Sequence, residues 1–147
     1  MDQSIRSLMS QNVVSVTPTQ SIQEVAALME QNDCGAIPVV ENGQVRGIIT
    51  DRDLALRATA HNLQSNTPCS QCMSGTLTVA NADMDIHQAA QLMAQNQIRR
   101  LPVVDNNQIV GMLSIGDLAT QDIYKNEAGQ ALSNISIHTH LDQQNPQ

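Results

Sequence analysis

Aromatic residues are almost absent from this 147-residue chain, which has no tryptophan, no phenylalanine and a single tyrosine, Tyr124. Proteins that bind single strands usually stack the bases on aromatic side chains, so that binding mode is not expected here. Basic residues are also few, with 7 Lys and Arg against 14 Asp and Glu and a net charge of −7. Nucleic-acid binders usually present a basic stripe. The composition therefore argues against a nucleic-acid partner.

Long apolar runs are missing as well. No stretch approaches the ~20 apolar residues that cross a bilayer, and residues 1–10 lack the basic-then-apolar pattern of a signal peptide. We therefore expect a cytoplasmic protein with no membrane partner. In that compartment the three cysteines, Cys34, Cys69 and Cys72, are expected to be thiols rather than a disulfide framework.

An internal repeat organises the chain. Residues 21–32 (SIQEVAALMEQN) return at 85–96 (DIHQAAQLMAQN), and residues 37–55 return at 101–119, in each case 64 positions later. This register predicts four parts: a first repeat with a short N-terminal helix (1–60), a linker with a short helix (61–76), a second repeat (77–125) and a partly flexible C-terminal segment (126–147). Thr67 is expected to be the N-cap of the linker helix, with Pro68 at its first helical position. This short helix corresponds to the one expected at 4–9.

Each repeat is predicted to have the order β-α-β-β-α, an α/β (α+β) fold. Short strands are expected at 13–16 and 77–80 because of their β-branched residues. Ser21 and Asp85 start the next helices with capping-box spacing. Apolar residues at helical spacing predict the buried faces: Ile22, Val25, Ala26 and Met29 in the first, and Ile86, Ala89, Ala90 and Met93 in the second. A further helix is expected within 126–137.

Hairpins are expected next. The sequences ENGQ (41–44) and DNNQ (105–108) supply residues that tolerate positive φ. They separate a buried strand beginning at 36 or 100 from a returning strand that ends at Thr50 or Ser114. A single sheet per repeat has a face to cover, so two repeats packing together is physically sensible.

The motifs Thr50-x-x-Asp53 and Ser114-x-x-Asp117 follow the returning strands. One interpretation is helix capping, since hydroxyl-x-x-acid is an N-terminal signature. Two features favour a ligand site instead. A capping box prefers Glu or Gln at the fourth position, whereas both copies have Asp. A helix N-terminus beside the motif also suits anions. Both interpretations stay open from the residues alone.

Together these elements resemble a tandem pair of CBS domains, a Bateman module. The resemblance rests on CGAIPVVENGQVRGIITDRDLA and IRRLPVVDNNQIVGMLSIGDLA, each preceded by its helix, and covers residues 4–125. It is greatest to the small stand-alone CBS-pair proteins of bacteria. The resemblance implies two repeats packed by pseudo-two-fold symmetry and a homodimer. It also implies clefts that bind adenosine-containing ligands: AMP, ADP or ATP, and less readily S-adenosylmethionine or NAD.

The site implied by the resemblance has a simple chemistry. A carboxylate can accept both hydroxyls of a ribose, so Asp53 and Asp117 are the expected ribose ligands. Thr50 and Ser114 would bond the ribose or a phosphate. Residues before the prolines would line the adenine and ribose: Gly35, Ala36 and Ile37 in the first repeat, and Arg100 and Leu101 in the second.

The two copies differ in charge. Arg99 and Arg100 stand where the first repeat has Gly35 and Ala36, while Arg52 stands where the second has Gly116. Guanidinium groups suit phosphate because their planar fork donates two parallel bonds. We hypothesise that Arg99 and Arg100 serve the nucleotide at Asp53, and that Arg52 serves the one at Asp117. The alternative is that these arginines are surface or salt-bridging residues.

Other constellations favour less specific roles. Cys69-x-x-Cys72 lacks the further ligands of a structural zinc site. We therefore expect both cysteines to be helix residues that neither bind a metal nor take part in redox chemistry. His138-x-His140 is a weak metal pattern. No nucleophile–base set is evident, and an enzyme is not expected. The predicted function is a regulatory module that passes its nucleotide state to a protein partner. The alternative is a structural or interaction module without a physiological nucleotide.

Overall fold

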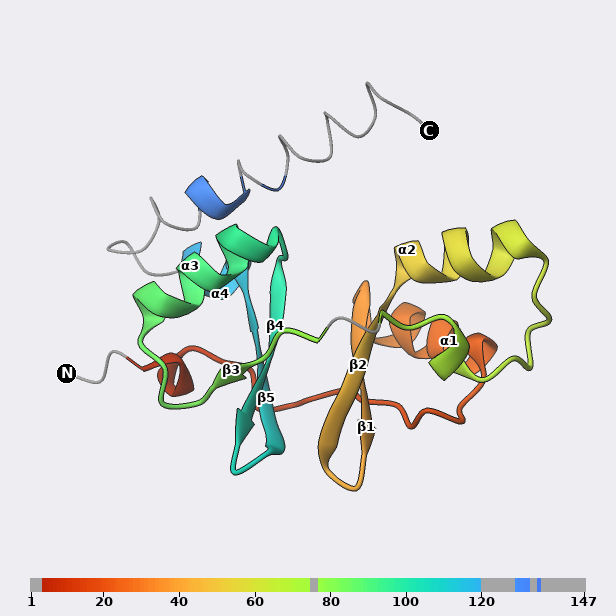
Figure 1. The fold of residues 1–147 in the computed structure, drawn as a ribbon, viewed down its shortest axis with the longest axis horizontal. Helices are drawn as coiled ribbons and strands as arrows, with labels where there is room; N and C mark the ends of the chain where they lie inside the picture. The colour runs from red at the N-terminus through yellow and green to blue at the C-terminus, as the bar shows by residue number, and fades with distance from the viewer. Residues whose placement is uncertain (1–3, 75–76, 120–128, 133–134, 136–147) are drawn as a thin grey trace. The chain divides into compact units, whose positions relative to one another are not determined.

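The computed structural model describes residues 4–74, 77–119, 129–132 and 135. They form a mixed α+β fold, as predicted, with a two-stranded sheet β1-β2 and a three-stranded sheet β3-β4-β5 (Figure 1). The strands are β1 (Ala36–Glu41), β2 (Gln44–Thr50), β3 (Ala80–Asn81), β4 (Arg100–Asp105) and β5 (Gln108–Ser114). The helices are α1 (Ile22–Asn32), α2 (Asp51–Asp53), α3 (Ile86–Asn96) and α4 (Ile115–Ala119). Helix α2 continues as a π-helical turn over Leu54–Ala58 and a 3-10 turn over Thr59–His61.

The chain folds as two compact units. The first unit comprises Asn12–Leu77 with Asn106–Ile109, and contains β1, β2, α1 and α2. The second unit comprises the described residues of 1–11, 78–105 and 110–147, and contains β3, β4, α3, α4 and β5 from residue 110 on. The predicted division at 1–60, 61–76, 77–125 and 126–147 follows chain order and stays a prediction.

Helices α1 and α3 begin where their caps predict. Ser21 accepts the Glu24 backbone N–H at 3.1 Å, and Asp85 closes a reciprocal capping box with Gln88. The face predicted for α3 is buried throughout, and so are three of the four residues predicted for α1. Ala26 is exposed, so its assignment to that face was wrong. Helical spacing alone does not specify how wide a stripe the sheet covers.

The hairpins form at the predicted turns, where Asn42, Gly43, Asn106 and Asn107 all have positive φ. The strand expected at 13–16 is reduced to one parallel bridge, Val16 with Val39, held by hydrogen bonds to Pro38 O and from Val40 N–H. Its counterpart is displaced toward the C-terminus, as β3 lies parallel to β4 with Ala80 opposite Val103. β-propensity identified both segments but not the length of the pairing, which depends on tertiary context.

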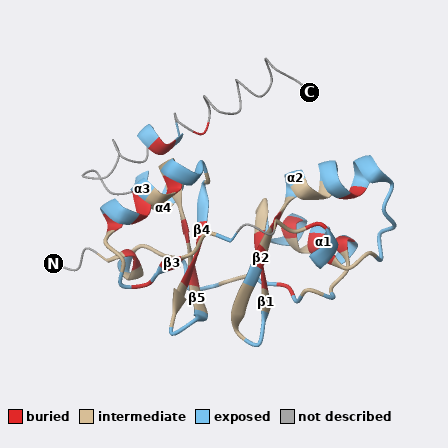
Figure 2. Ribbon diagram, in the orientation of Figure 1, coloured by how far each residue is buried: buried red, intermediate tan, exposed pale blue. Residues whose placement is uncertain are grey.

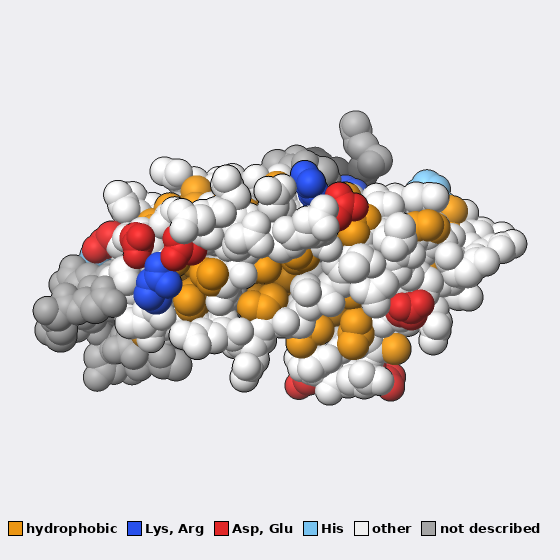
Figure 3. All heavy atoms as spheres, turned by 90° about the horizontal axis from the view of Figure 1, so that it is seen from below, with side chains coloured by type: hydrophobic (Ala, Val, Ile, Leu, Met, Phe, Trp, Pro, Cys, Tyr) orange, Lys and Arg blue, Asp and Glu red, His pale blue; other side chains and the backbone are white. Residues whose placement is uncertain are grey.

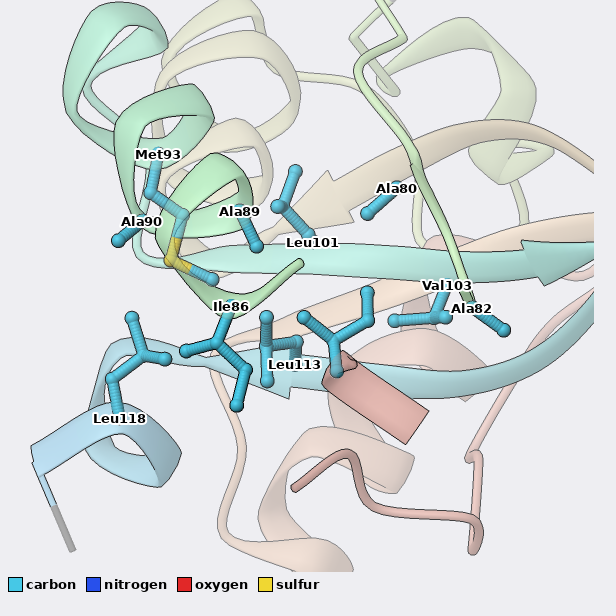
Figure 4. Close-up of a cluster of buried hydrophobic side chains, with 11 residues drawn as sticks. Ala80, Ala82, Ile86, Ala89, Ala90, Met93, Leu101, Val103, Leu113 and Leu118 are labelled. Atoms are coloured by element: carbon cyan, nitrogen blue, oxygen red, sulfur yellow. The ribbon is translucent and has the colours of Figure 1, made fainter. Parts of the chain in front are cut away.

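Each unit has its own apolar core, seen as the buried residues in Figure 2. In the second unit, side chains of α3 lie over those of β4 and β5, with Met93, Leu101 and Leu113 each 0% exposed (Figure 4). In the first unit, Ile37 and Ile49 stand 64 positions before Leu101 and Leu113 and are also 0% exposed. Aliphatic and methionine side chains thus build most of both cores, joined in the first unit by Cys69 and Cys72, as the scarcity of aromatic residues requires.

Two short segments, which we term the leading segments (4–10 and 68–74), dock in the same way on opposite repeats. Residues 4–10 join the second unit through bridges from Ser4 to Asp85 and from Ser10 to Met112. Residues 68–74 join the first unit through bridges that lie 64 positions away, Ser21 to Pro68 and Ile48 to Ser74. The short helix placed in repeat 1 by chain order therefore packs with the second repeat.

Both leading segments contain a 3-10 turn where a short helix is predicted, at Ile5–Ser7 and Cys69–Gln71. Pro68 rather than Thr67 occupies the N-cap position of the second turn. Residues 129–132 and 135 are helical, and the rest of the helix predicted within 126–137 lies outside the described residues. Among the described helices, none is long and apolar enough to cross a membrane.

Candidate functional site

The first hydroxyl–aspartate motif lies where β2 meets α2. Thr50 is the N-cap residue and has extended backbone, with φ −117° and ψ 163°. Its Oγ1 accepts a hydrogen bond from the Asp53 backbone N–H at 3.1 Å, and Asp53 Oδ2 accepts one from the Thr50 N–H at 2.9 Å. These two bonds form a reciprocal capping box. The capping interpretation is therefore realised in the first repeat.

The second motif has the same arrangement. The Ser114 N–H donates to Asp117 Oδ2 at 2.8 Å, and the Asp117 N–H donates to Ser114 Oγ at 3.2 Å. The sequence argument that aspartate disfavours capping is thus wrong for both copies.

Capping leaves the aspartate with spare acceptor capacity. A carboxylate offers about four acceptor positions, and the box at Asp53 uses Oδ2 for a single N–H. The other oxygen, Oδ1, lies 3.7 Å from Arg57 Nε, and the Asp53 side chain is 14% exposed. A carboxylate that is held by its own backbone and partly shielded from water can still accept hydroxyl groups from a ligand.

The residues before the prolines lie against the motifs. The Asp51 N–H donates to Gly35 O at 2.9 Å, and Ala36 pairs with Thr50 in the register of β1 and β2. The same bond recurs 64 positions later, where the Ile115 N–H donates to Arg99 O at 2.9 Å. The structure therefore brings the predicted pre-proline residues and the predicted motif together within each repeat.

Three of the pre-proline positions are constrained by packing. Ile37 and Leu101 are 0% exposed and their side chains belong to the two cores, so their backbone is the part left to contact a ligand. Gly35 is close to Asp51, whose Oδ2 would lie 3.0 Å from a Cβ at residue 35. The Asp51 side chain thus lies next to Gly35 in the first repeat. The sequence did not indicate this contact.

The arginines divide into two groups. Arg6, Arg46 and Arg57 each form an ion pair with a carboxylate. The predicted phosphate ligands Arg52, Arg99 and Arg100 are exposed, and their guanidinium groups have no hydrogen bond or ion pair with the part of the chain that the structure describes. On the face in Figure 3, basic side chains occur in small separate groups. Salt bridging therefore does not account for these three arginines.

Arg57 is a residue of the motif region that sequence reasoning missed. Besides its contact with Asp53, its Nη1 donates to the Met73 carbonyl at 3.1 Å. The spacing of four residues from Asp53 to Arg57 is visible in the sequence and is typical of a helical ion pair. The bond to Met73 spans 16 residues, so the sequence carried no signal for it.

Cys69 and Cys72 are free thiols and are both 0% exposed. Burial raises the pKa of each thiol, and the charge of Asp53 raises the pKa of Cys72 further. The Cys69 thiol donates to the Thr17 carbonyl at 3.2 Å. Within the described residues, no group of three or more His, Cys, Asp or Glu side chains could hold a metal ion. His138 and His140 lie outside the described residues.

Comparisons with known proteins agree with this arrangement. A family model described as "CBS domain" matches residues 5–58 and 69–122. The "CBS domain-containing protein YhcV" of Bacillus subtilis is 50% identical over 133 residues, which are 90% of this chain and 95% of that protein.

Solved structures share the fold. A CBS domain protein from Pyrobaculum aerophilum, complexed with AMP, superposes with a TM-score of 0.75 at 28% identity and covers 86% of this chain and 98% of its own. The structure of Hypoxic Response Protein I with two coordinated zinc ions has a TM-score of 0.75 at 26% identity, covering 80% of this chain and 98% of its own. A protein of that name from Mycobacterium tuberculosis is 27% identical over 116 residues, 78% of this chain and 81% of its own.

Proposed function

The chain belongs to the CBS domain family, and from that premise we propose that it is a regulatory module that binds adenosine-containing nucleotides of the AMP, ADP or ATP class. One observation carries the proposal. In each repeat a capped, partly buried aspartate follows, by two residues, a backbone hydrogen bond to the pre-proline stretch: Asp51 N–H to Gly35 O before Asp53, and Ile115 N–H to Arg99 O before Asp117. The AMP complex of the Pyrobaculum aerophilum protein supports this ligand class.

The ribose is assigned to the aspartates. In this proposal its two hydroxyls donate to the carboxylate, and the hydroxyls of Thr50 and Ser114, which accept the Asp53 and Asp117 N–H, are assigned to the sugar or a phosphate. A ligand without a ribose hydroxyl leaves an acceptor unpaired, which costs about 1–3 kcal/mol. Since 1.4 kcal/mol is a factor of ten, the deoxy compound should bind about 5- to 150-fold more weakly.

The phosphates are assigned to Arg52, Arg99 and Arg100. These guanidinium groups are exposed and are not engaged by the described carboxylates, so they are available to a ligand anion. The assignment of Arg99 and Arg100 to the nucleotide at Asp53, and of Arg52 to the one at Asp117, stays a prediction. Loss of AMP binding relative to adenosine in Arg100→Ala would support it.

The function proposed is binding and regulation rather than catalysis. YhcV and Hypoxic Response Protein I do not carry enzyme names. A homodimer and a protein partner that reads the ligand state belong to the same proposal. Sedimentation with and without AMP tests the dimer. The competing function is a structural or interaction module with no physiological nucleotide.

Calorimetry with AMP and 2′-deoxy-AMP separates the two functions. Asp53→Asn and Asp117→Asn keep a side-chain oxygen for the capping box but remove the negative charge and one acceptor. We expect each substitution to weaken AMP binding at its own repeat, and the double variant to lose both the binding and the preference for ribose. Asp85→Asn is the matched control, because Asp85 caps α3 outside the motif. Unchanged AMP affinity in the double variant would remove the aspartates from the site.

A further inference from the structure

Arg57 makes two contacts in different directions. Its Nε lies 3.7 Å from Asp53 Oδ1, the carboxylate oxygen that the capping box leaves free. Its Nη1 donates to the Met73 carbonyl at 3.1 Å. One planar guanidinium group therefore joins the proposed ribose ligand to the leading segment 68–74.

That leading segment is docked on the first unit by several contacts. The Cys69 N–H donates to Gln20 O at 2.8 Å, and the Ser74 N–H donates to Ile48 O at 3.1 Å. Met73 packs over Gly47, with its sulfur 2.9 Å from the place of a Cβ there. Cys72 lies close enough to Asp53 and Arg57 for both charges to act on its thiol. The segment, the arginine and the aspartate thus form one contiguous cluster.

The arginine of this link is not repeated in the sequence. The residue 64 positions after Arg57 is Gln121, which has no charge to pair with Asp117. The methionine is repeated, since Met9 corresponds to Met73. The docking of a leading segment is therefore common to both repeats, whereas the arginine that follows the aspartate by four residues occurs in the first copy of the motif.

We infer that Arg57 is a positioning residue that couples nucleotide occupancy at Asp53 to the docking of the leading segment 68–74; this inference rests on the proposed function. Ribose hydroxyls that donate to Asp53 hold its carboxylate in place and so favour the Arg57 geometry that also binds Met73. By linkage, a docked segment favours nucleotide binding by the same factor. A guanidinium group suits this role because its donors point in fixed, divergent directions.

Alkylation of the buried thiols reports on docking. Cys69 and Cys72 are 0% exposed, so iodoacetamide reaches them when the segment opens. Trypsin separates them from Cys34, because Arg46 and Arg52 lie between. The rates are measured by mass spectrometry at one pH, without nucleotide and at saturating AMP. Calorimetry on each variant fixes the saturating concentration.

We expect saturating AMP to slow alkylation of Cys69 and Cys72 in the wild-type protein by about fivefold or more, the lower end of ordinary coupling between sites. The measured ratio is the alkylation rate without nucleotide divided by the rate at saturating AMP. In Arg57→Gln this ratio should fall to about one, even with the site filled. Arg57→Lys keeps the charge but not the fork, so an intermediate ratio is expected. Arg46→Gln is the control, since Arg46 pairs with Glu41 in the same unit and should keep the wild-type ratio.

Two outcomes overturn different statements. A wild-type ratio in Arg57→Gln at saturating AMP refutes the coupling while leaving the proposed function intact. Absence of AMP binding to the wild-type protein refutes the proposed function. Docking is then still tested without ligand, because Arg57→Gln should alkylate faster than Arg46→Gln. Equal rates in the two variants would show that Arg57 does not hold the segment.

Discussion

Replacing Gly47 or Gly111 with alanine tests how the leading segments dock. A Cβ at residue 47 would lie 2.9 Å from the Met73 sulfur and 3.0 Å from the Ser74 carbonyl oxygen. At residue 111 the corresponding distances are 2.7 Å to the Met9 sulfur and 2.8 Å to the Ser10 oxygen. Ordinary van der Waals contacts of a Cβ fall between 3.4 and 4 Å, so both sites lack room for a methyl group.

The magnitude follows from which neighbour can move. A methionine side chain can rotate away, but the carbonyl of Ser10 accepts the Met112 N–H at 2.9 Å and cannot shift without weakening that bond. Overpacking of this kind costs about 1–3 kcal/mol. For a protein of this size each kcal/mol lowers Tm by about 2–4 °C. We therefore expect Gly111→Ala, with the shorter distances, to lose more stability than Gly47→Ala.

Thermal and urea unfolding measure the effect. Gly116→Ala is the control, because the nearest atom to a Cβ there is Ser114 Oγ at an ordinary 3.5 Å. Alanine in that helical position should be neutral or stabilising by up to about 1 kcal/mol. If Gly47→Ala and Gly111→Ala were as stable as Gly116→Ala, the close docking of both leading segments would be refuted.

The remaining predictions concern the core, a cap and the thiols. Leu101→Ala should lower the free energy of unfolding by about 2–5 kcal/mol, since Leu101 is 0% exposed in the second core. Ser21→Ala should cost about 1 kcal/mol because the Glu24 N–H loses its acceptor. Burial raises the pKa of the Cys69 and Cys72 thiols. The unfolded thiols, at about 8.5, therefore lose their protons first, and stability falls as pH rises above that value toward the folded-state pKa.

Controls make each of these results interpretable. Leu56→Ala changes a leucine that is 51% exposed, and should alter urea unfolding by no more than about 0.5 kcal/mol. Ser70→Ala removes an exposed serine hydroxyl and should leave Tm unchanged. A variant with alanine at residues 69 and 72 should show a shallower loss of stability between neutral and alkaline pH. Equal slopes in that variant and the wild type would contradict the role of the buried thiols.

Much of the local structure was predictable because it depends on neighbours in the chain. Asn42 and Gly43 adopt positive φ where the ENGQ turn requires it, and Ser21 begins α1 at the predicted residue. The aspartate motif was also located correctly in both copies, since strand, hydroxyl and acid are contiguous. Its capping box was misjudged, because the aspartate reaches the N-cap backbone N–H in both copies despite its shorter side chain.

Ala26 and Arg57 show where sequence reasoning stops. Ala26 fits the apolar spacing of α1, yet it is exposed, because the width of the covered stripe depends on the sheet below. Arg57 is four residues from Asp53, so their pairing is a local feature. Its second bond, to the Met73 carbonyl, forms between residues that meet after the chain has folded back.

The sequence by itself determined the repeat, the helix-strand-strand-helix order in each half, the two hairpin turns and the paired hydroxyl–aspartate motifs. These follow from periodicity and local backbone preference, which act over a few residues. Only the tertiary structure decided that residues 4–10 dock on the second repeat and residues 68–74 on the first, and that Arg57 joins Asp53 to Met73. The physical reason is that the two leading segments have equivalent sequences, so local preferences do not tell which repeat each one docks on. That pairing depends on contacts between residues far apart in the chain.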